Sequence, residues 1–235
     1  MNEFFANLAY FGVFLSIGSY LIGVYLNRRF KSALLNPLLI SIVLCMAFLA
    51  VFKIDFSTFS HGKNNTGATM LQNLLTPTTA CLAIPLYEKI GELKKQPLAI
   101  LLGIGAGVLA SVGTIFLMSK LFSLTREQYI TLLPKSITTA IGMGVSEELG
   151  GYVSITVAVI IMTGILGNMG AELACRVFRI TDPVARGVAI GTAAHAIGTT
   201  KAMELGEIEG AMSSLSIVVA GMLTVAGASL FAGLL

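Results

Sequence analysis

The sequence predicts an all-α polytopic membrane protein with about five full spans and three broken or re-entrant helical segments. The first observation is the composition, because 55% of the 235 residues are apolar and only 11% are charged. About a quarter of an ordinary soluble domain is charged. The mean hydropathy of +0.87 agrees. A chain with so few charges cannot cover a globular surface, so lipid must solvate much of it. The alternating pattern of membrane barrel strands is absent.

The second observation is a set of uncharged runs that approach the ~20 residues needed to cross a hydrocarbon layer. The predicted spans are 4–26, 33–52, 98–119, 152–171 and 210–232. The N-terminus begins MNEFF and runs directly into the first span, so no cleavable signal peptide is expected. No stretch is long enough to form a separate soluble domain. The prediction is a single integral membrane domain over residues 1–235.

The third observation is that segments 67–87, 129–149 and 187–204 carry helix breakers or polar clusters. Their central sequences are LLTPTTACLAIP, LPKSITTAIGMG and HAIGTTK. Irregular backbone at membrane depth is tolerated only where protein or a water-filled cavity surrounds it. Secondary transporters build solute sites from such discontinuous helices, often in inverted repeats. The triplet TTA at 78–80 recurs at 138–140, which suggests such a repeat, although chance explains three residues equally well.

The distribution of basic residues predicts the orientation. Arg28 and Arg29 follow the first span, so the N-terminus is expected outside. The arginine cluster within 176–186 then lies inside only if segment 129–149 re-enters the membrane instead of crossing it. The central uncharged part of that segment is also too short for a simple span. Both observations favour a hairpin or a broken pair of helices.

Hydroxyl groups beside the breaks are candidates for binding a solute. A helix break exposes N–H groups that attract anions and carbonyl groups that attract cations. The candidates are Thr76, Thr78, Thr79, Ser136, Thr138, Thr139, Thr192, Thr199 and Thr200. The alternative for each hydroxyl is a hydrogen bond to its own helical turn or to a neighbouring helix.

Two lysines, Lys135 and Lys201, lie at the edges of broken segments. Each ammonium group is a candidate partner for the carboxylate of a substrate. The alternative is a long side chain that extends to the lipid headgroups.

His195 is the only histidine inside an apolar segment. On a regular helix it shares a face with Thr192 and Thr199. A second face is made of small residues only: Gly187, Gly191, Ala194, Gly198 and Ala202. Ionisable groups inside a bilayer are costly, so His195 is predicted to bind a carboxylate or to carry a coupled proton. The alternative is a neutral histidine whose ring bonds a neighbouring hydroxyl or carbonyl group.

Several polar residues are candidates for binding a coupling ion. They are Asn73, Glu147, Glu148, His195 and Glu204. The alternative for the paired acids at 147 and 148 is that they are solvated at the end of a hairpin.

Other functional classes lack their motifs. GTTK does not meet the spacing of a phosphate-binding loop, and the hydrolase motif GxSxG is absent. The three cysteines are scattered singly, without metal or disulfide spacing. We therefore expect no enzyme activity, no cofactor and no metal site. The net charge of +3 lies in short loops, which argues against a nucleic-acid partner.

Four stretches together resemble the LrgB/CidB family of bacterial membrane proteins. They are LLNPLLISIVL (34–44), LLTPTTACLAIPLYEKI (74–90), LPKSITTAIGMGVSEELGG (133–151) and RGVAIGTAAHAIGTTKAMELGEIEGAMSSLSIVVAGMLT (186–224). The resemblance covers nearly the whole chain. Ala140 stands where the family favours proline, and Ala194 stands where it favours serine or glycine.

The resemblance implies two competing functions. One is antiholin-like regulation of murein hydrolases and autolysis, together with a small holin-like partner of the LrgA/CidA type. The other is transport of small monocarboxylates such as pyruvate, lactate, glycolate or glycerate across the bacterial plasma membrane. Plastid relatives carry glycolate and glycerate, and bacterial pairs are linked to pyruvate. The broken, hydroxyl-rich segments favour the transporter, because a holin requires only simple self-associating spans. A homodimer is expected, since 235 residues form a thin scaffold.

Overall fold

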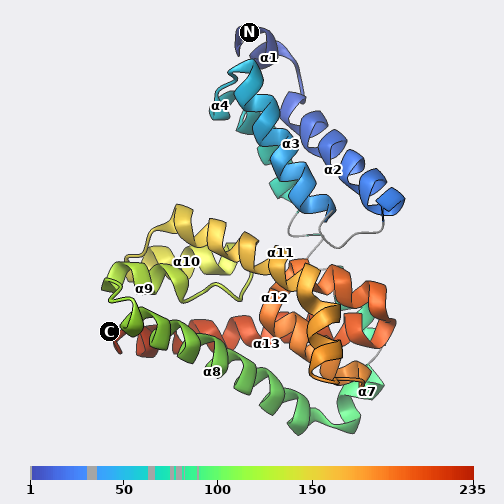
Figure 1. The fold of residues 1–235 in the computed structure, drawn as a ribbon, viewed down its shortest axis with the longest axis vertical. Helices are drawn as coiled ribbons and strands as arrows, with labels where there is room; N and C mark the ends of the chain where they lie inside the picture. Colours follow the sequence, from blue (N-terminus) through green and yellow to red (C-terminus); the bar gives the residue numbers. More distant parts are fainter. Residues whose placement is uncertain are drawn as a thin grey trace. The chain divides into compact units, whose positions relative to one another are not determined.

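The computed structural model describes residues 2–30, 36–62, 67–74, 77, 81, 83–88 and 90–235. Every regular element within these residues is helical. The chain divides into two compact units, Met1–Cys81 and Leu82–Leu235. The predicted all-α membrane fold is confirmed (Figure 1).

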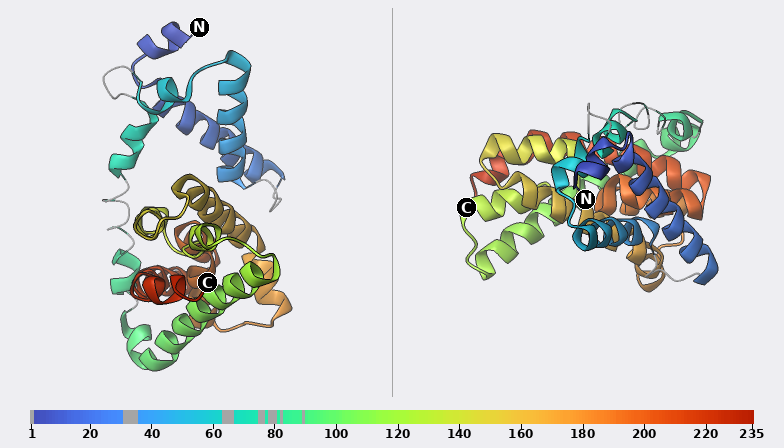
Figure 2. Two further views of the ribbon diagram at one scale, coloured as in Figure 1. Left: turned by 90° about the vertical axis from the view of Figure 1, so that its left-hand side faces the viewer. Right: turned by 90° about the horizontal axis from the view of Figure 1, so that it is seen from above.

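The first unit is built around an antiparallel helical pair. Its elements are α1 (Asn2–Asn7), α2 (Phe11–Phe30), α3 (Pro37–Phe52), α4 (Phe56–Ser60) and the 3-10 helix η2 (Ala68–Leu74). Figure 2 shows α2 and α3 side by side, and a Cβ atom at Gly23 would lie 2.6 Å from the carbonyl oxygen of Pro37. Asn36 caps α3, because its side chain accepts from the N–H of Leu38 at 2.9 Å. The predicted span 4–26 is wrong in its bounds, since the chain turns at Tyr10 (φ 62°) and divides it between α1 and α2.

The second unit contains the longer helices. They are α6 (Ala83–Glu88), α7 (Ile90–Lys95), α8 (Pro97–Leu121), α9 (Arg126–Leu132), α10 (Thr139–Leu149), α11 (Val153–Val177), α12 (Pro183–Leu205) and α13 (Glu207–Ala232). The helices α12 and α13 form a hairpin about Gly206, and α12 also packs against α8 and α11. Ile104 and Val108 of α8 belong to the core cluster that contains Met212 of α13.

Among the described residues, three helices are long and apolar enough to cross a membrane: α8, α11 and α13. They match the predicted spans 98–119, 152–171 and 210–232. The predicted span 33–52 corresponds to α3, an apolar helix of 16 residues.

Two of the predicted breaks are present. Segment 129–149 is interrupted between Leu132 and Thr139, where Pro134 has no N–H to continue a helix. Segment 187–204 lies in α12, whose backbone is non-helical at His195 (φ 42°, ψ −141°). In segment 67–87 the structure describes η2, α6 and single residues only, and the 78–80 triplet of the suggested repeat lies outside the described residues.

Candidate functional site

A cavity of about 660 Å³ lies in the second unit between α8, the α9–α10 connection and the first half of α12. Its volume falls in the range of about 300–1,000 Å³ that is typical of small-molecule sites. Polar groups enter it from all three sides: Ser111 and Thr114 from α8, Lys135 and Ser136 from the connection, and Thr192 from α12.

The ammonium group of Lys135 is the positive charge of this cavity. Its Nζ donates to the Oγ of Ser111 at 3.0 Å and to the Oγ of Ser136 at 2.9 Å, and the two hydroxyl oxygens lie 3.0 Å apart. The side chain is half-buried, and within the part of the chain that the structure describes it has no carboxylate within ion-pair distance. An ammonium carries three N–H donors, so one remains for another acceptor. A half-buried charge without a counter-charge favours the binding of an anion.

One carboxylate also borders the cavity. Asp182 caps α12, and its Oδ1 accepts from the N–H of Ala185 at 2.8 Å. This hydrogen bond directs the acid to the end of its own helix.

The helix α8 approaches α12 closely through a stripe of small residues. Gly103, Gly107 and Ser111 recur every four residues and all line the cavity. A Cβ atom at Gly107 would lie 2.6 Å from the Cγ2 atom of Thr192. Sequence reasoning treated this helix as a simple span and missed Ser111 and Thr114. The signal was present as the small-residue spacing in GIGAGVLAS, which is typical of close helix packing.

His195 is enclosed by α11. Its side chain is 2% exposed, and Nε2–H donates to the carbonyl oxygen of Ile160 at 3.0 Å. Gly164 leaves room for the ring, because a Cβ atom there would lie 2.7 Å from the Cε1 atom of His195. The imidazole therefore stabilises the contact of the broken helix with α11.

The predicted common face of Thr192, His195 and Thr199 is not formed. Of the three, only Thr192 lines the cavity. Thr199 is buried, and its hydroxyl lies 3.0 Å from the carbonyl oxygen of His195 and 2.7 Å from the Oγ of Ser213 on α13. The physical reason is the break itself, since the non-helical backbone at position 195 changes the rotation between the two halves of α12. A role in solute binding for His195 and Thr199 stays a prediction.

The predicted small-residue face packs as expected in the first half of α12. A Cβ atom at Gly187 would lie 2.5 Å from the carbonyl oxygen of Glu209, and one at Gly191 would meet the backbone of Ser213. Beyond this point Ala194 packs against Gly167 of α11. Positions 187 and 191 require glycine, because the backbone of α13 lies too close for a side chain.

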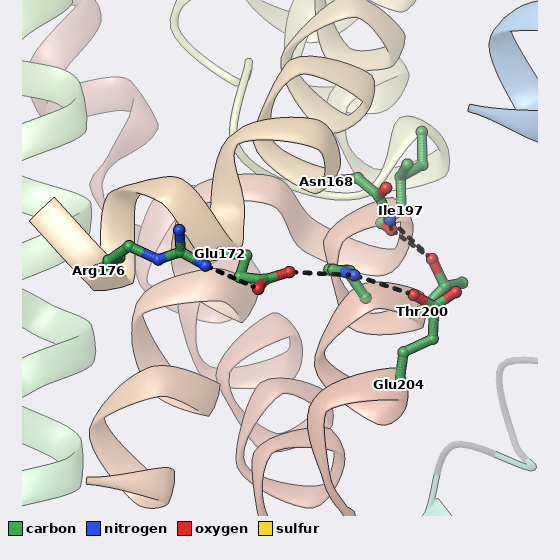
Figure 3. A network of polar contacts seen from close by, with 7 residues as sticks. Asn168, Glu172, Arg176, Ile197, Thr200 and Glu204 are labelled. Atoms are coloured by element: carbon green, nitrogen blue, oxygen red, sulfur yellow. Dashed lines mark hydrogen bonds and ion pairs between the residues drawn. The ribbon is translucent and has the colours of Figure 1, made fainter. Parts of the chain in front are cut away.

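The second half of α12 is tied to α11 by a polar network (Figure 3). Asn168 Nδ2 donates to the Oγ1 of Thr200 at 3.0 Å and to the carbonyl oxygen of Ile197 at 2.8 Å. Lys201 Nζ lies 3.2 Å from Glu204 and 3.7 Å from Glu172. Thr200, Lys201 and Glu204 therefore lie outside the cavity lining. Thr200 bonds Asn168, whereas Lys201 and Glu204 form an ion-pair network with Glu172 of α11.

The remaining predicted residues lie apart from the cavity or outside the described residues. Thr138 and Thr139 are half-buried at the start of α10, and Glu147 and Glu148 are exposed near its end. Asn73 is exposed in η2 of the first unit. The threonines at 76, 78 and 79 lie outside the described residues. Of the predicted residues, the cavity brings together Lys135, Ser136 and Thr192.

Within the described residues no group of three or more His, Cys, Asp or Glu side chains is placed to hold a metal ion. The fold and the cavity define a helical membrane protein with broken helices beside a largely apolar cavity that holds one lysine and several hydroxyl groups. Residues 16–234 match the model of the LrgB-like family, and the chain belongs to this family.

Its relatives include antiholin-like protein LrgB of Bacillus cereus (strain B4264) and antiholin-like protein LrgB of Bacillus anthracis (strain CDC 684 / NRRL 3495). Each is 36% identical to this chain over 217 residues, which is 92% of both proteins. No solved structure matches the chain.

Proposed function

We propose that this chain is an antiholin-like protein of the bacterial plasma membrane that acts with a small holin-like partner of the LrgA/CidA type. The observation that carries the proposal is the similarity to antiholin-like LrgB proteins over nine-tenths of their length. This similarity supports the regulatory function more than the transport function that the sequence pattern favours. The proposed topology places the N-terminus outside, and the activity is not enzymatic.

The test is a deletion of the gene in its host. We expect the deletion strain to lyse faster after a mild detergent challenge and to show higher murein hydrolase activity in zymograms. Expression of the wild-type chain from a plasmid should restore both, and this restoration should require the holin-like partner. Equal lysis of deletion and parent strains would remove the proposal.

A second candidate function, transport of small monocarboxylates, is favoured by the cavity. A carboxylate of the size of pyruvate, lactate or glycolate fits a volume of about 660 Å³. The third N–H donor of Lys135 and the one hydroxyl proton that the Ser111–Ser136 pair does not use internally supply hydrogen bonds to such an anion. In this function, movement of the broken elements opens the site to each side in turn.

Uptake of labelled pyruvate, lactate and glycolate into proteoliposomes tests this second function. We expect saturable uptake by the wild-type chain. Light scattering should give the purified chain the mass of a homodimer. Lys135→Gln should lower uptake at least about tenfold, which corresponds to about 1.4 kcal/mol. Lys120→Gln is the matched control, because Lys120 is exposed on α8, outside the cavity lining, and its loss changes the net charge equally.

The outcomes separate three explanations. A leak without saturation would exclude a transporter and favour a holin-like pore. Uptake that is unchanged in Lys135→Gln would exclude the cavity as the site while leaving transport intact. Reduced uptake in His195→Ala and Thr199→Ala, with the fold retained, would support the predicted role of the α12 break.

A further inference from the structure

A second cavity, of about 460 Å³, lies where α11 ends and α12 begins. Three arginines border it: Arg176 from the last turn of α11, Arg179 from the connection and Arg186 from the first turns of α12. Ile180 and Leu205 contribute apolar wall. The lining therefore combines three basic side chains and one acid, Glu172, with apolar wall.

Two of the three arginines lie within ion-pair distance of a carboxylate. Arg186 is fixed by donation from its Nε to the carbonyl oxygen of Ile180 at 2.8 Å, and its Nη1 lies 4.0 Å from the buried carboxylate of Glu209. Arg176 lies 3.4 Å from Glu172, a carboxylate that also pairs with a lysine of α12.

Arg179 is the arginine with a free charge. Within the part of the chain that the structure describes, its guanidinium makes no ion pair. Its backbone is in the left-handed region (φ 55°) directly after α11, and the side chain borders the cavity. The hydroxyl of Thr181 borders the same space as a further donor.

The cavity adjoins a surface suited to lipid chains. The helix α11 is long and apolar enough to span a membrane, and it ends at Val177. Next to the arginines, Leu173, Val177 and Phe178 are 63%, 65% and 75% exposed. Basic pockets beside the ends of membrane helices are typical contacts of anionic headgroups.

We propose that this cavity binds the phosphate group of an anionic phospholipid, with its acyl chains along the exposed end of α11. Guanidinium groups match phosphate oxygens with two parallel hydrogen bonds, and Arg179 has this fork available. A free phosphate ion shares the chemistry of the headgroup, but the apolar surface beside the cavity favours the lipid. The site is separate from the Lys135 cavity and does not depend on either proposed function.

Native mass spectrometry of the full chain in detergent micelles tests the proposal. The chain is titrated with phosphatidylglycerol and with phosphatidylcholine of identical acyl chains, and bound lipid is counted. We expect preferential retention of phosphatidylglycerol, and an affinity about tenfold lower in Arg179→Gln, from the loss of a charge-assisted hydrogen bond. Arg126→Gln is the matched control, because Arg126 is exposed at the start of α9 and does not line this cavity; its affinity should stay within about twofold of wild type.

A second variant, Arg179→Lys, keeps the charge but loses the fork, and it should lose part of the affinity. It also replaces Arg179→Gln as the test if the glutamine variant does not fold. Equal retention of the two lipids, or equal losses in Arg179→Gln and Arg126→Gln, would overturn the proposal. Displacement of phosphatidylglycerol by millimolar inorganic phosphate would overturn the lipid assignment and identify a site for free phosphate.

Discussion

The break in α12 and the break between α9 and α10 place a nitrogen-bearing side chain in very different surroundings. At the first, His195 is almost fully buried and bonds the backbone of α11, while the nearby hydroxyl of Thr199 bonds α13. At the second, Lys135 is half-buried beside a cavity, and its hydrogen bonds within the described residues go to two hydroxyl groups. Polar side chains at helix breaks therefore have two uses. Those with protein partners fix the packing of the break, and those with spare hydrogen-bonding capacity are available to a ligand.

The largest expected effect is the loss of stability in His195→Ala. The variant removes the hydrogen bond that His195 donates to the carbonyl oxygen of Ile160 and creates a cavity against Gly164. We expect a loss of about 3 kcal/mol in the free energy of unfolding. Thermal unfolding in detergent measures it. His61→Ala, at an exposed histidine of the first unit, is the control and should change stability by about 0.5 kcal/mol or less. Equal losses in both variants would remove the structural role of His195.

Thr199→Val is expected to have the next largest effect. The variant keeps the shape of the side chain but removes the hydrogen bonds to His195 and Ser213 in a buried position. We expect a loss of about 1–2 kcal/mol in stability. Thr114→Val is the comparison and should lose less, because Thr114 is exposed and its hydroxyl donates to the carbonyl oxygen of Ala110 in its own helical turn. An unchanged free energy of unfolding in Thr199→Val would show that the contact with α13 does not stabilise the break.

Lys135→Gln should have a small effect on stability, in contrast to His195→Ala. The substitution removes a charge that is half-buried without a carboxylate partner among the described residues, so the lost hydrogen bonds are offset by a smaller desolvation cost. We expect a change within about 1 kcal/mol, measured by the same thermal unfolding. A loss as large as that of His195→Ala would mean that both breaks are structural, and the comparison would fail.

The smallest expected effect is a pH dependence at the start of α9. The pKa of the exposed Glu127 carboxyl is held below its ordinary range, chiefly by a hydrogen bond from its own backbone N–H and then by the Thr125 hydroxyl. A lowered folded-state pKa means that the stabilisation is complete near neutral pH and is lost as the pH falls through the folded pKa. The unfolding temperature of Glu127→Gln should therefore fall slightly less at acid pH than that of the wild type. Identical acid profiles would contradict this assignment.

The sequence alone determined the class of the protein and the positions of two helix breaks. The class follows from composition, because the low charge content requires lipid as solvent. The break before α10 follows from Pro134, whose ring has no N–H for helix continuation. The small-residue face that includes Gly187 and Gly191 also follows from local spacing, since it reflects helix periodicity.

Only the tertiary structure decided which polar residues meet a cavity and which meet protein. The partner of His195 lies 35 residues away at Ile160, and a partner of Lys135 lies 24 residues away at Ser111 on a helix that reads as a plain span. Helical spacing placed His195 and Thr199 on a solute-facing side, but the non-helical backbone at 195 turned them into the packed interior. Composition and spacing act over a few residues, whereas the surroundings of a side chain depend on which distant helix packs against it.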